Sequence, residues 1–181
     1  ADIYCIIMGD EPMISAEDEQ TLIDKMMIFP DCDAIMLTET FDDPVDVVNT
    51  TTIKLAINDD GYLIFMSRMP IPYPKEILGY KYYKNVGCYA IKKDTLDFYL
   101  KTMPGACERA EGIELLRLLE NNKRVLTYTV DSTSMAVDTP KDLERVKNYL
   151  AEKANANDSN YDGKRKGKII NENNWNHTCK I

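Results

Sequence analysis

Residues 1–12, ADIYCIIMGDEP, set an apolar run directly against two acids and a proline. The run at 3–8 is continuously apolar and rich in β-formers, which predicts a strand buried on both faces. Strands of this kind are typical of α/β sheets, in which ligands gather at the carboxyl ends of the strands. The carboxylates of Asp10 and Glu11 therefore stand where a ligand is expected.

Apolar runs and amphipathic segments alternate along the rest of the chain. The stretch 41–49 is expected to be a loop with a short helical turn, and 69–80, with three prolines in five residues, is expected to lack regular structure. This order predicts an α/β fold with a mainly parallel sheet, flanking helices and a local antiparallel piece. The predicted strands are 3–8, 32–40, 52–57, 63–68, 85–92, 125–130 and a short one at 134–137, and the predicted helices are 15–29, 94–100, 108–121 and 140–150.

The helices carry recognisable end signals. Ser15 is predicted to cap the first helix, with Asp18 three residues later as its capping-box partner. Asp94 is predicted to cap the second helix, and Pro140 occupies the first position of the last one. The side chains expected to face the core are Leu22, Ile23, Met26 and Met27 in the first helix, and Ala110, Ile113, Leu116 and Leu119 in the helix at 108–121.

Composition narrows the class of protein. The chain has 181 residues and a formal net charge of −8, which argues against a nucleic-acid or anionic-membrane surface. Its five cysteines are scattered without a C-x-x-C motif, which favours a reducing, cytoplasmic location over a disulfide scaffold. No segment reaches membrane-spanning length, and no signal peptide is visible.

The last part of the chain differs from the rest. Residues 154–181 are rich in Asn, Lys, Asp and Gly, which predicts a polar, flexible tail after a domain at 1–153. The single histidine, His177, lies in this tail, so no Ser-His or Cys-His catalytic pair is expected in the core.

Two predicted strands end in an acid followed by a proline: IIMGDEP, with Asp10, and MAVDTP, with Asp138. Their carboxylates are expected to meet at one edge of the sheet. Carboxylate oxygens suit Mg²⁺, which takes one or two of them together with substrate phosphates. The alternatives are helix capping for Asp138 and a plain surface loop for Asp10 and Glu11.

Several motifs in fixed order carry a family resemblance: GDEP at 9–12, DDGYLIFMSRMPIPYP at 59–74, YYKNVGCYAIKKD at 82–94, EGIELLRLLENN at 111–122 and VDTPKDLERVKNYL at 137–150. Over roughly residues 1–150 the sequence resembles the CMP-Kdo synthetases, the 3-deoxy-manno-octulosonate cytidylyltransferases. The resemblance implies a nucleotide-transferase α/β fold and a homodimer. It also implies Mg²⁺-dependent coupling of CTP to an acidic sugar, giving a CMP-sugar and pyrophosphate for surface polysaccharide synthesis.

The resemblance assigns roles to individual residues. Asp10 and Asp138 correspond to the catalytic metal ligands beside the reacting phosphate, and Glu11 lies close to them. Arg68 is a candidate to hold the sugar carboxylate, with pairing to a structural acid as its alternative. Glu114 is a candidate to bind sugar hydroxyls, with an ordinary helix-surface acid as its alternative.

Two further residues, Glu111 and Tyr89, are weaker candidates for contact with the sugar. Glu111 is a weaker candidate than Glu114, and an ordinary surface role is favoured for it. Tyr89 alternates with core residues along its strand, which favours packing over contact with a ligand.

Three positions depart from the family pattern on its sugar side. Met8 stands where the family has Gln, Asn85 where it often has His, and Leu115 where it often has Gln. Met8 and Asn85 are therefore counted among the substrate-binding candidates. The acceptor stays open between Kdo, a related 3-deoxy acid sugar and another small acid such as a phosphonate.

The resemblance also concerns the front of the domain. The family begins with a strand and a glycine-rich, basic loop that cradles the CTP phosphates. No such loop precedes Asp10 here, and the strand at 3–8 corresponds to a later strand of the family, the fourth or fifth. The sequence is thus expected to correspond to the C-terminal two-thirds of a cytidylyltransferase, with the N-terminal strands missing. The alternative is a truncated, non-catalytic remnant that keeps the fold as an interaction module.

Overall fold

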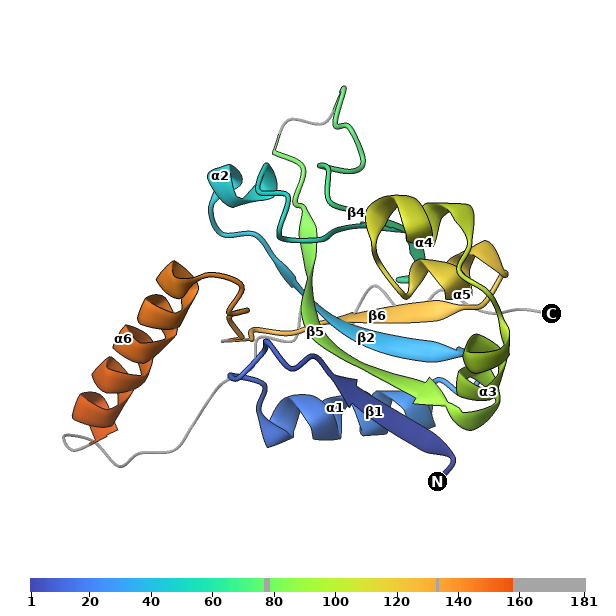
Figure 1. The fold of residues 1–181 in the computed structure, drawn as a ribbon, viewed down its shortest axis with the longest axis horizontal. Helices are drawn as coiled ribbons and strands as arrows, with labels where there is room; N and C mark the ends of the chain where they lie inside the picture. Colours follow the sequence, from blue (N-terminus) through green and yellow to red (C-terminus); the bar gives the residue numbers. More distant parts are fainter. Residues whose placement is uncertain (77–78, 133, 158–181) are drawn as a thin grey trace.

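The computed structural model describes residues 1–76, 79–132 and 134–157 as a mixed α/β fold (Figure 1). The predicted α/β class is confirmed. The strands are β1 (Ile3–Ile7), β2 (Ala34–Thr40), β3 (Lys54–Ile57), β4 (Leu63–Ser67), β5 (Tyr83–Lys92) and β6 (Val125–Thr129), and the helices are α1 (Ala16–Ile28), α2 (Pro44–Val47), α3 (Lys93–Lys101), α4 (Ala106–Glu111), α5 (Leu116–Glu120) and α6 (Pro140–Asn157). Helices and strands alternate only up to β3: β3, β4 and β5 follow one another, as do α3, α4 and α5.

The long strand β5 organises the sheet. It runs antiparallel to β2 along one side, while its other side pairs with β3 near Tyr83 and with β1 from Cys88 to Lys92. β6 extends the sheet parallel to β2, and β4 closes a hairpin with β3. The sheet is mixed, not mainly parallel as the sequence predicted, because β5 is antiparallel to β1, β2 and β3.

Both faces of β2 are buried, as its continuous apolar run predicts. Ala34 and Met36 pack with the buried side chains that follow α4, whereas Ile35 and Leu37 pack with Leu22 of α1. Two apolar layers therefore sandwich the strand.

Helix α1 confirms its predicted start and corrects its predicted face. Ser15 and Asp18 form the capping box. Leu22 and Met26 are buried, but Ile23 is 38% and Met27 70% exposed. The prediction that all four face the core was wrong, because α1 contacts the sheet along a narrow stripe with the i, i+4 spacing.

The predicted helix at 108–121 was wrong as a single element. Gly112 adopts a left-handed conformation, with φ of 64°, and ends α4 after one and a half turns. Residues 113–115 then cross to α5, which buries Leu116, while Ala110 is exposed. The break places Ile113, Glu114 and Leu115 on a connecting segment instead of a helix face.

Three other local predictions also fail. Cys5 and Ile7 of β1 are exposed, because β1 pairs only with β5 among the described strands and lies at the edge of the sheet. Asp94 lies inside the first turn of α3, whose N-cap is Lys92. Residues 134–137, before Asp138, form no strand.

The C-terminal helix confirms its predicted start at Pro140 and extends beyond residue 150. It projects from the sheet body in Figure 1. Residues 154–157 belong to this helix, and the rest of the predicted tail lies outside the described residues. Within the described part of the chain, no helix is long and apolar enough to cross a membrane.

Candidate active site

Two segments that end in acids meet beside the sheet, and we name them together the acid edge (residues 8–11 and 134–138). The backbone N–H of Val137 donates to the carbonyl of Asp10 at 2.8 Å, which brings Asp138 next to the loop that follows β1. Asp10 and Asp138 are both exposed. The predicted meeting of the two segments agrees with this contact, and metal binding by the two aspartates stays a prediction.

Glu11 is the half-buried acid of this edge. Its carboxylate accepts a hydrogen bond from the Ser134 hydroxyl and packs directly over the backbone of Gly87. A Cβ on Gly87 would stand 2.4 Å from Cγ of Glu11, and the φ of Gly87 is +80°, so both space and backbone require glycine there. Burial raises the pKa of the Glu11 carboxyl to about 7 against the hydrogen bond from Ser134, and the charge of Asp10 adds to the rise.

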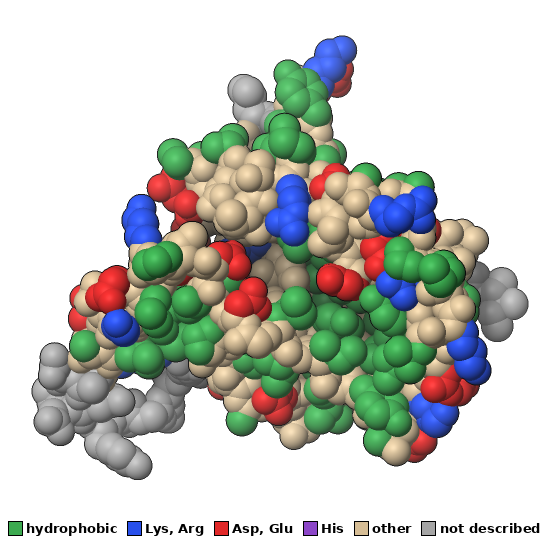
Figure 2. All heavy atoms as spheres, viewed as in Figure 1, with side chains coloured by type: hydrophobic (Ala, Val, Ile, Leu, Met, Phe, Trp, Pro, Cys, Tyr) green, Lys and Arg blue, Asp and Glu red, His purple; other side chains and the backbone are tan. Residues whose placement is uncertain are grey.

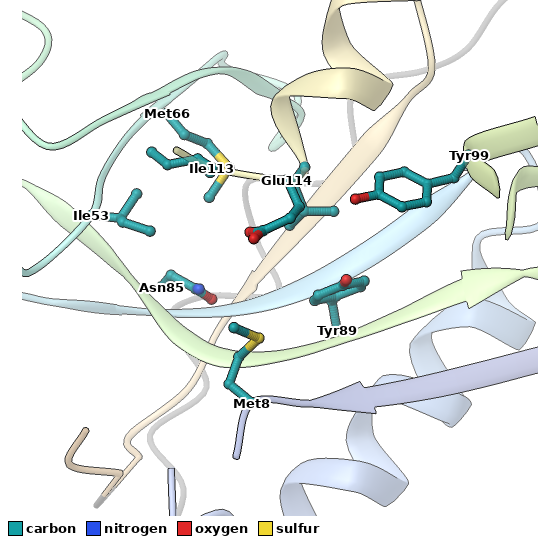
Figure 3. A pocket seen from close by; sticks show the side chains of 9 residues that line it. Met8, Ile53, Met66, Asn85, Tyr89, Tyr99, Ile113 and Glu114 are labelled. Carbon is teal, nitrogen blue, oxygen red and sulfur yellow. The ribbon is translucent and has the colours of Figure 1, made fainter. Parts of the chain in front are cut away.

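A cavity of about 270 Å³ lies beside the acid edge (Figure 3). This volume suits a small metabolite. Figure 2 shows a hollow near the centre of the face viewed, with both acidic and basic side chains around it. Of the predicted substrate-binding residues, the cavity brings together Met8, Asn85 and Glu114; its full lining is Met8, Ile53, Met66, Asn85, Tyr89, Tyr99, Ile113, Glu114 and Leu115.

The three positions that depart from the family pattern, Met8, Asn85 and Leu115, all line this one cavity. They come from the end of β1, from β5 and from the segment after α4. Sequence reasoning placed them on a common side of the site, and the fold gathers them in space.

Two tyrosines also line the cavity: Tyr89, for which packing was predicted, and Tyr99, for which no role was predicted. Tyr89 lines it from β5, so its side chain does more than fill the core. Burial raises the pKa of Tyr89 to about 12, with Tyr99 and Glu114 acting in the same direction, and keeps its hydroxyl neutral. Tyr99 of α3 points its hydroxyl toward Glu114 in Figure 3, and sequence analysis missed it.

The place of Tyr99 is set by an ion pair behind it. The Arg117 guanidinium stacks 3.9 Å over the Tyr99 ring and donates to the carbonyls of Tyr99 and Thr102 at 3.1 and 3.0 Å. Its Nε and Nη2 donate to both carboxylate oxygens of Glu108 at 2.7 and 2.5 Å. Because Glu108 is buried, this bidentate pair fixes the end of α3 against α4 and α5.

Arg68 does not line the cavity. Its Nε donates to the carbonyl of Glu111 at 2.9 Å, and its Nη1 donates to the carbonyl of Thr50 at 3.2 Å. The carboxylate of Glu111 in turn accepts from the Ser67 hydroxyl at 2.7 Å and from the Arg68 backbone at 3.0 Å. Both side chains therefore make structural contacts, Arg68 with backbone carbonyls instead of an acid.

A buried lysine extends this brace. Lys54 is fully buried, and its ammonium donates to the carbonyls of Asn49, Thr52 and Arg68 at 2.5, 2.8 and 2.7 Å. Burial lowers the pKa of this ammonium, and the charge of Arg68 adds to the effect. All three donors are used, so Lys54 ties β3 to the segment after β4.

The acidic side chains of the site can be compared with the ligands that Mg²⁺ takes. Among the described residues, no group of three or more His, Cys, Asp or Glu side chains is placed to hold a metal ion. Two exposed carboxylates on adjoining segments are the donor set that Mg²⁺ takes when substrate phosphates complete its coordination. The residues of the acid edge fit such an ion.

Comparisons with known proteins agree with this geometry. The "3-deoxy-manno-octulosonate cytidylyltransferase" of Escherichia coli is 35% identical over 152 residues, covering 84% of this chain and 61% of that protein. The enzyme of that name from Chlorobium phaeobacteroides is 33% identical, covering 82% of this chain and 62% of that protein. The chain thus spans about three fifths of the length of these relatives.

Solved structures match as well. CMP:2-keto-3-deoxy-manno-octonic acid synthetase complexed with CTP has a TM-score of 0.77 and 34% identity, covering 84% of this chain and 63% of its own. UDP-glucose pyrophosphorylase, at 16% identity and a TM-score of 0.54, shares the fold. These matches confirm the nucleotide-transferase fold and the resemblance to CMP-Kdo synthetases.

A family model described as "Cytidylyltransferase" matches residues 1–125. The match includes the GDEP loop, the strand that carries Asn85 and Tyr89, and the segment that carries Glu114. Since it covers more than half of the sequence, this chain belongs to the cytidylyltransferase family.

Proposed function

We propose that this chain supplies the acceptor side and the metal edge of an enzyme that couples CTP to an acidic sugar, releasing pyrophosphate and forming a CMP-sugar. Membership of the cytidylyltransferase family supports the reaction class. The observation that carries the proposal is the hydrogen bond from Val137 to Asp10, which joins the two aspartate-bearing segments. Beside them, the cavity presents Asn85 and Glu114 to an acceptor.

In this proposal the residues divide the work. Asp10 and Asp138 hold Mg²⁺, which when bound neutralises charge that develops on the phosphate oxygens. Glu11 supports the loop that carries Asp10. Glu114 and Asn85 bind acceptor hydroxyls, and Arg68 positions the segment at 111–112 that leads into the cavity.

The assay uses the full-length gene product with CTP, Mg²⁺ and a panel of acceptors, and it measures pyrophosphate release. Asp10→Asn and Asp138→Asn are each expected to reduce turnover by at least about 100-fold, because each removes a charged metal ligand. Asp59→Asn, an exposed aspartate in the β3–β4 turn, is the matched control and keeps full turnover. Turnover that survives both substitutions at the acid edge contradicts the metal assignment.

The acceptor panel contains Kdo, a related 3-deoxy acid sugar and a phosphonate. Kdo is the expected substrate class, because the relatives are named 3-deoxy-manno-octulosonate cytidylyltransferases. Preference for the phosphonate would move the reaction to another acceptor. No turnover with any acceptor would favour the non-catalytic interaction module.

We also propose a homodimer and a cytoplasmic location. Met69 and Tyr73, in the proline-rich segment after β4, are 61% and 84% exposed and suit a protein contact. Light scattering of Tyr73→Lys is expected to give a smaller mass than the parent; a monomeric parent contradicts the dimer.

The proposed cytoplasmic location agrees with the free thiols of Cys5, Cys32, Cys88 and Cys107, which suit a reducing compartment. Cell fractionation checks this location.

A further inference from the structure

The cavity has two chemically different sides. Tyr89, Tyr99 and Glu114 bring polar groups to one side, each from a different part of the chain (Figure 3). Among the described residues that line the cavity, the other side has no hydrogen-bonding side-chain group except the amide of Asn85. Its apolar members are Met8, Ile53, Met66, Ile113 and Leu115.

Burial divides the lining by depth. Met66, Ile113 and Leu115 are 1%, 3% and 6% exposed and form the floor, whereas Met8 is 40% exposed and Glu114 is also exposed, so they stand at the mouth. A hydroxyl pressed onto that floor loses its water and gains no side-chain partner, which costs free energy. A methyl or methylene group on the same floor gains from burial.

Charge limits the occupant further. The nine lining residues include no lysine, arginine or histidine, and Glu114 contributes a carboxylate. An anionic group on the distal end of an occupant would be repelled by the Glu114 carboxylate and would meet no cation among these nine residues. Met8 stands two residues before Asp10, so the mouth adjoins the acid edge, where the proposed metal ion would neutralise the acceptor's own carboxylate.

We infer that the cavity selects an acid sugar whose end distal to the carboxylate is uncharged and apolar, either deoxygenated or alkylated, with that end on Met66, Ile113 and Leu115. The hydroxyls nearer the mouth face Glu114, Tyr89 and Tyr99. This inference rests on the proposed transfer to an acidic sugar and names the kind of sugar that the site takes.

The test compares three acceptors in the full-length gene product: Kdo, 8-deoxy-Kdo, in which a methyl replaces the terminal hydroxymethyl, and Kdo with a phosphate ester at that end. We expect kcat/KM for 8-deoxy-Kdo to exceed that for Kdo by about 10-fold, and the phosphate ester to fall about 100-fold below Kdo. A ratio of 8-deoxy-Kdo to Kdo at or below one overturns the inference and leaves the proposed function standing.

Variants locate the selectivity. Leu115→Gln offers the distal end a hydrogen-bonding partner on the floor, whereas Met8→Gln adds the same group at the exposed mouth, away from the distal end. Leu115→Gln is expected to lower the preference for 8-deoxy-Kdo by about 10-fold, and Met8→Gln to keep it. Leu119→Gln is the control for the same change in α5 outside the cavity, and it keeps the preference. An unchanged preference in Leu115→Gln also overturns the inference.

A binding measurement separates this inference from the reaction. Titrating 8-deoxy-Kdo and then Kdo into protein with ¹³C-labelled methionine methyls follows Met66 on the cavity floor. Tighter binding of 8-deoxy-Kdo, with a shift of the Met66 signal, supports the inference even if no acceptor turns over and the proposed function fails. Equal or weaker binding overturns it.

Discussion

The two halves of the candidate site are held in very different ways. Behind the cavity, Arg117 is bonded to both oxygens of a buried carboxylate and to two carbonyls, and Lys54 is bonded to three carbonyls. At the acid edge, the described residues of the two segments are joined by the backbone hydrogen bond from Val137 to Asp10 and by the hydrogen bond from Ser134 to Glu11, and the side chains of Asp10 and Asp138 are exposed. The acceptor cavity is therefore rigidly braced, whereas the aspartates rest on few contacts.

This difference agrees with what each half is proposed to bind. An apolar cavity keeps its selectivity only if its walls stay in place, so it needs satisfied polar braces behind it. Carboxylates that bind a hydrated cation work from the solvent side, because Mg²⁺ keeps several waters. The substitutions below perturb the braced half first and then the acid edge, in order of decreasing effect.

Arg117→Leu should have the largest effect. It leaves the carboxylate of Glu108 buried without its partner, which is expected to cost about 3–5 kcal/mol of the free energy of unfolding. Urea unfolding measures the loss. The loss of the stacking cation also frees the Tyr99 ring, so the acceptor KM is expected to rise more than the KM for CTP.

Two variants control this result. Lys147→Leu breaks the exposed pair with Glu144 on α6 and is expected to cost less than about 1 kcal/mol. The double variant Arg117→Leu/Glu108→Leu should recover part of the loss, because it removes the stranded charge. A single-variant loss no larger than that of Lys147→Leu would mean that the brace is unimportant.

Gly87→Ala carries the comparison to the acid edge. The new Cβ would stand 2.4 Å from Cγ of Glu11 on a backbone with φ of +80°, so we expect a loss of about 1–3 kcal/mol and a displaced GDEP loop. Gly79→Ala is the matched control: its φ is +76°, and nothing lies within 4 Å of the added Cβ. Equal losses in the two variants would show that the contact with Glu11 adds nothing to backbone strain.

Some of this arrangement could be predicted from the sequence, because it depends on local pattern. The capping box at Ser15 and the start of α6 at Pro140 follow from end signals within one turn. The segments of Asp10 and Asp138 do meet, but the rule for strand ends does not account for it, because no strand precedes Asp138.

The rest depends on tertiary contacts that no local pattern encodes. Apolar spacing at 108–121 predicts one helix, and a single left-handed glycine, Gly112, divides it and turns Leu115 toward the cavity. In the sequence, Tyr99 is one more apolar position of α3, and its place in the cavity depends on the stacking of Arg117, which no local pattern predicts. Ile53 and Met66 reach the cavity only because the β3–β4 hairpin folds over it.

Glu11→Gln tests the half-buried acid through pH. The pKa of Glu11 is raised from 4.5 to about 7, so the folded state keeps a proton that the unfolded state releases between these values. The protein should lose stability as pH rises from 4.5 to 7, by about 1 kcal/mol after allowance for partial exposure. Glu11→Gln lacks this slope, and unfolding curves at several pH values measure the difference; parallel profiles would contradict the shifted pKa.

Ser134→Ala should have the smallest effect and shows how the acid edge is tuned. Its hydroxyl donates to the Glu11 carboxylate and lowers the pKa of that group, so its removal should raise the pKa and extend the loss of stability to higher pH. Above pH 7 the expected cost is about 0.5 kcal/mol, the low end of the net contribution of one hydrogen bond. The double variant Glu11→Gln/Ser134→Ala should match Glu11→Gln in its pH profile. A further change in that profile would mean that Ser134 acts on the acid edge through a group other than Glu11.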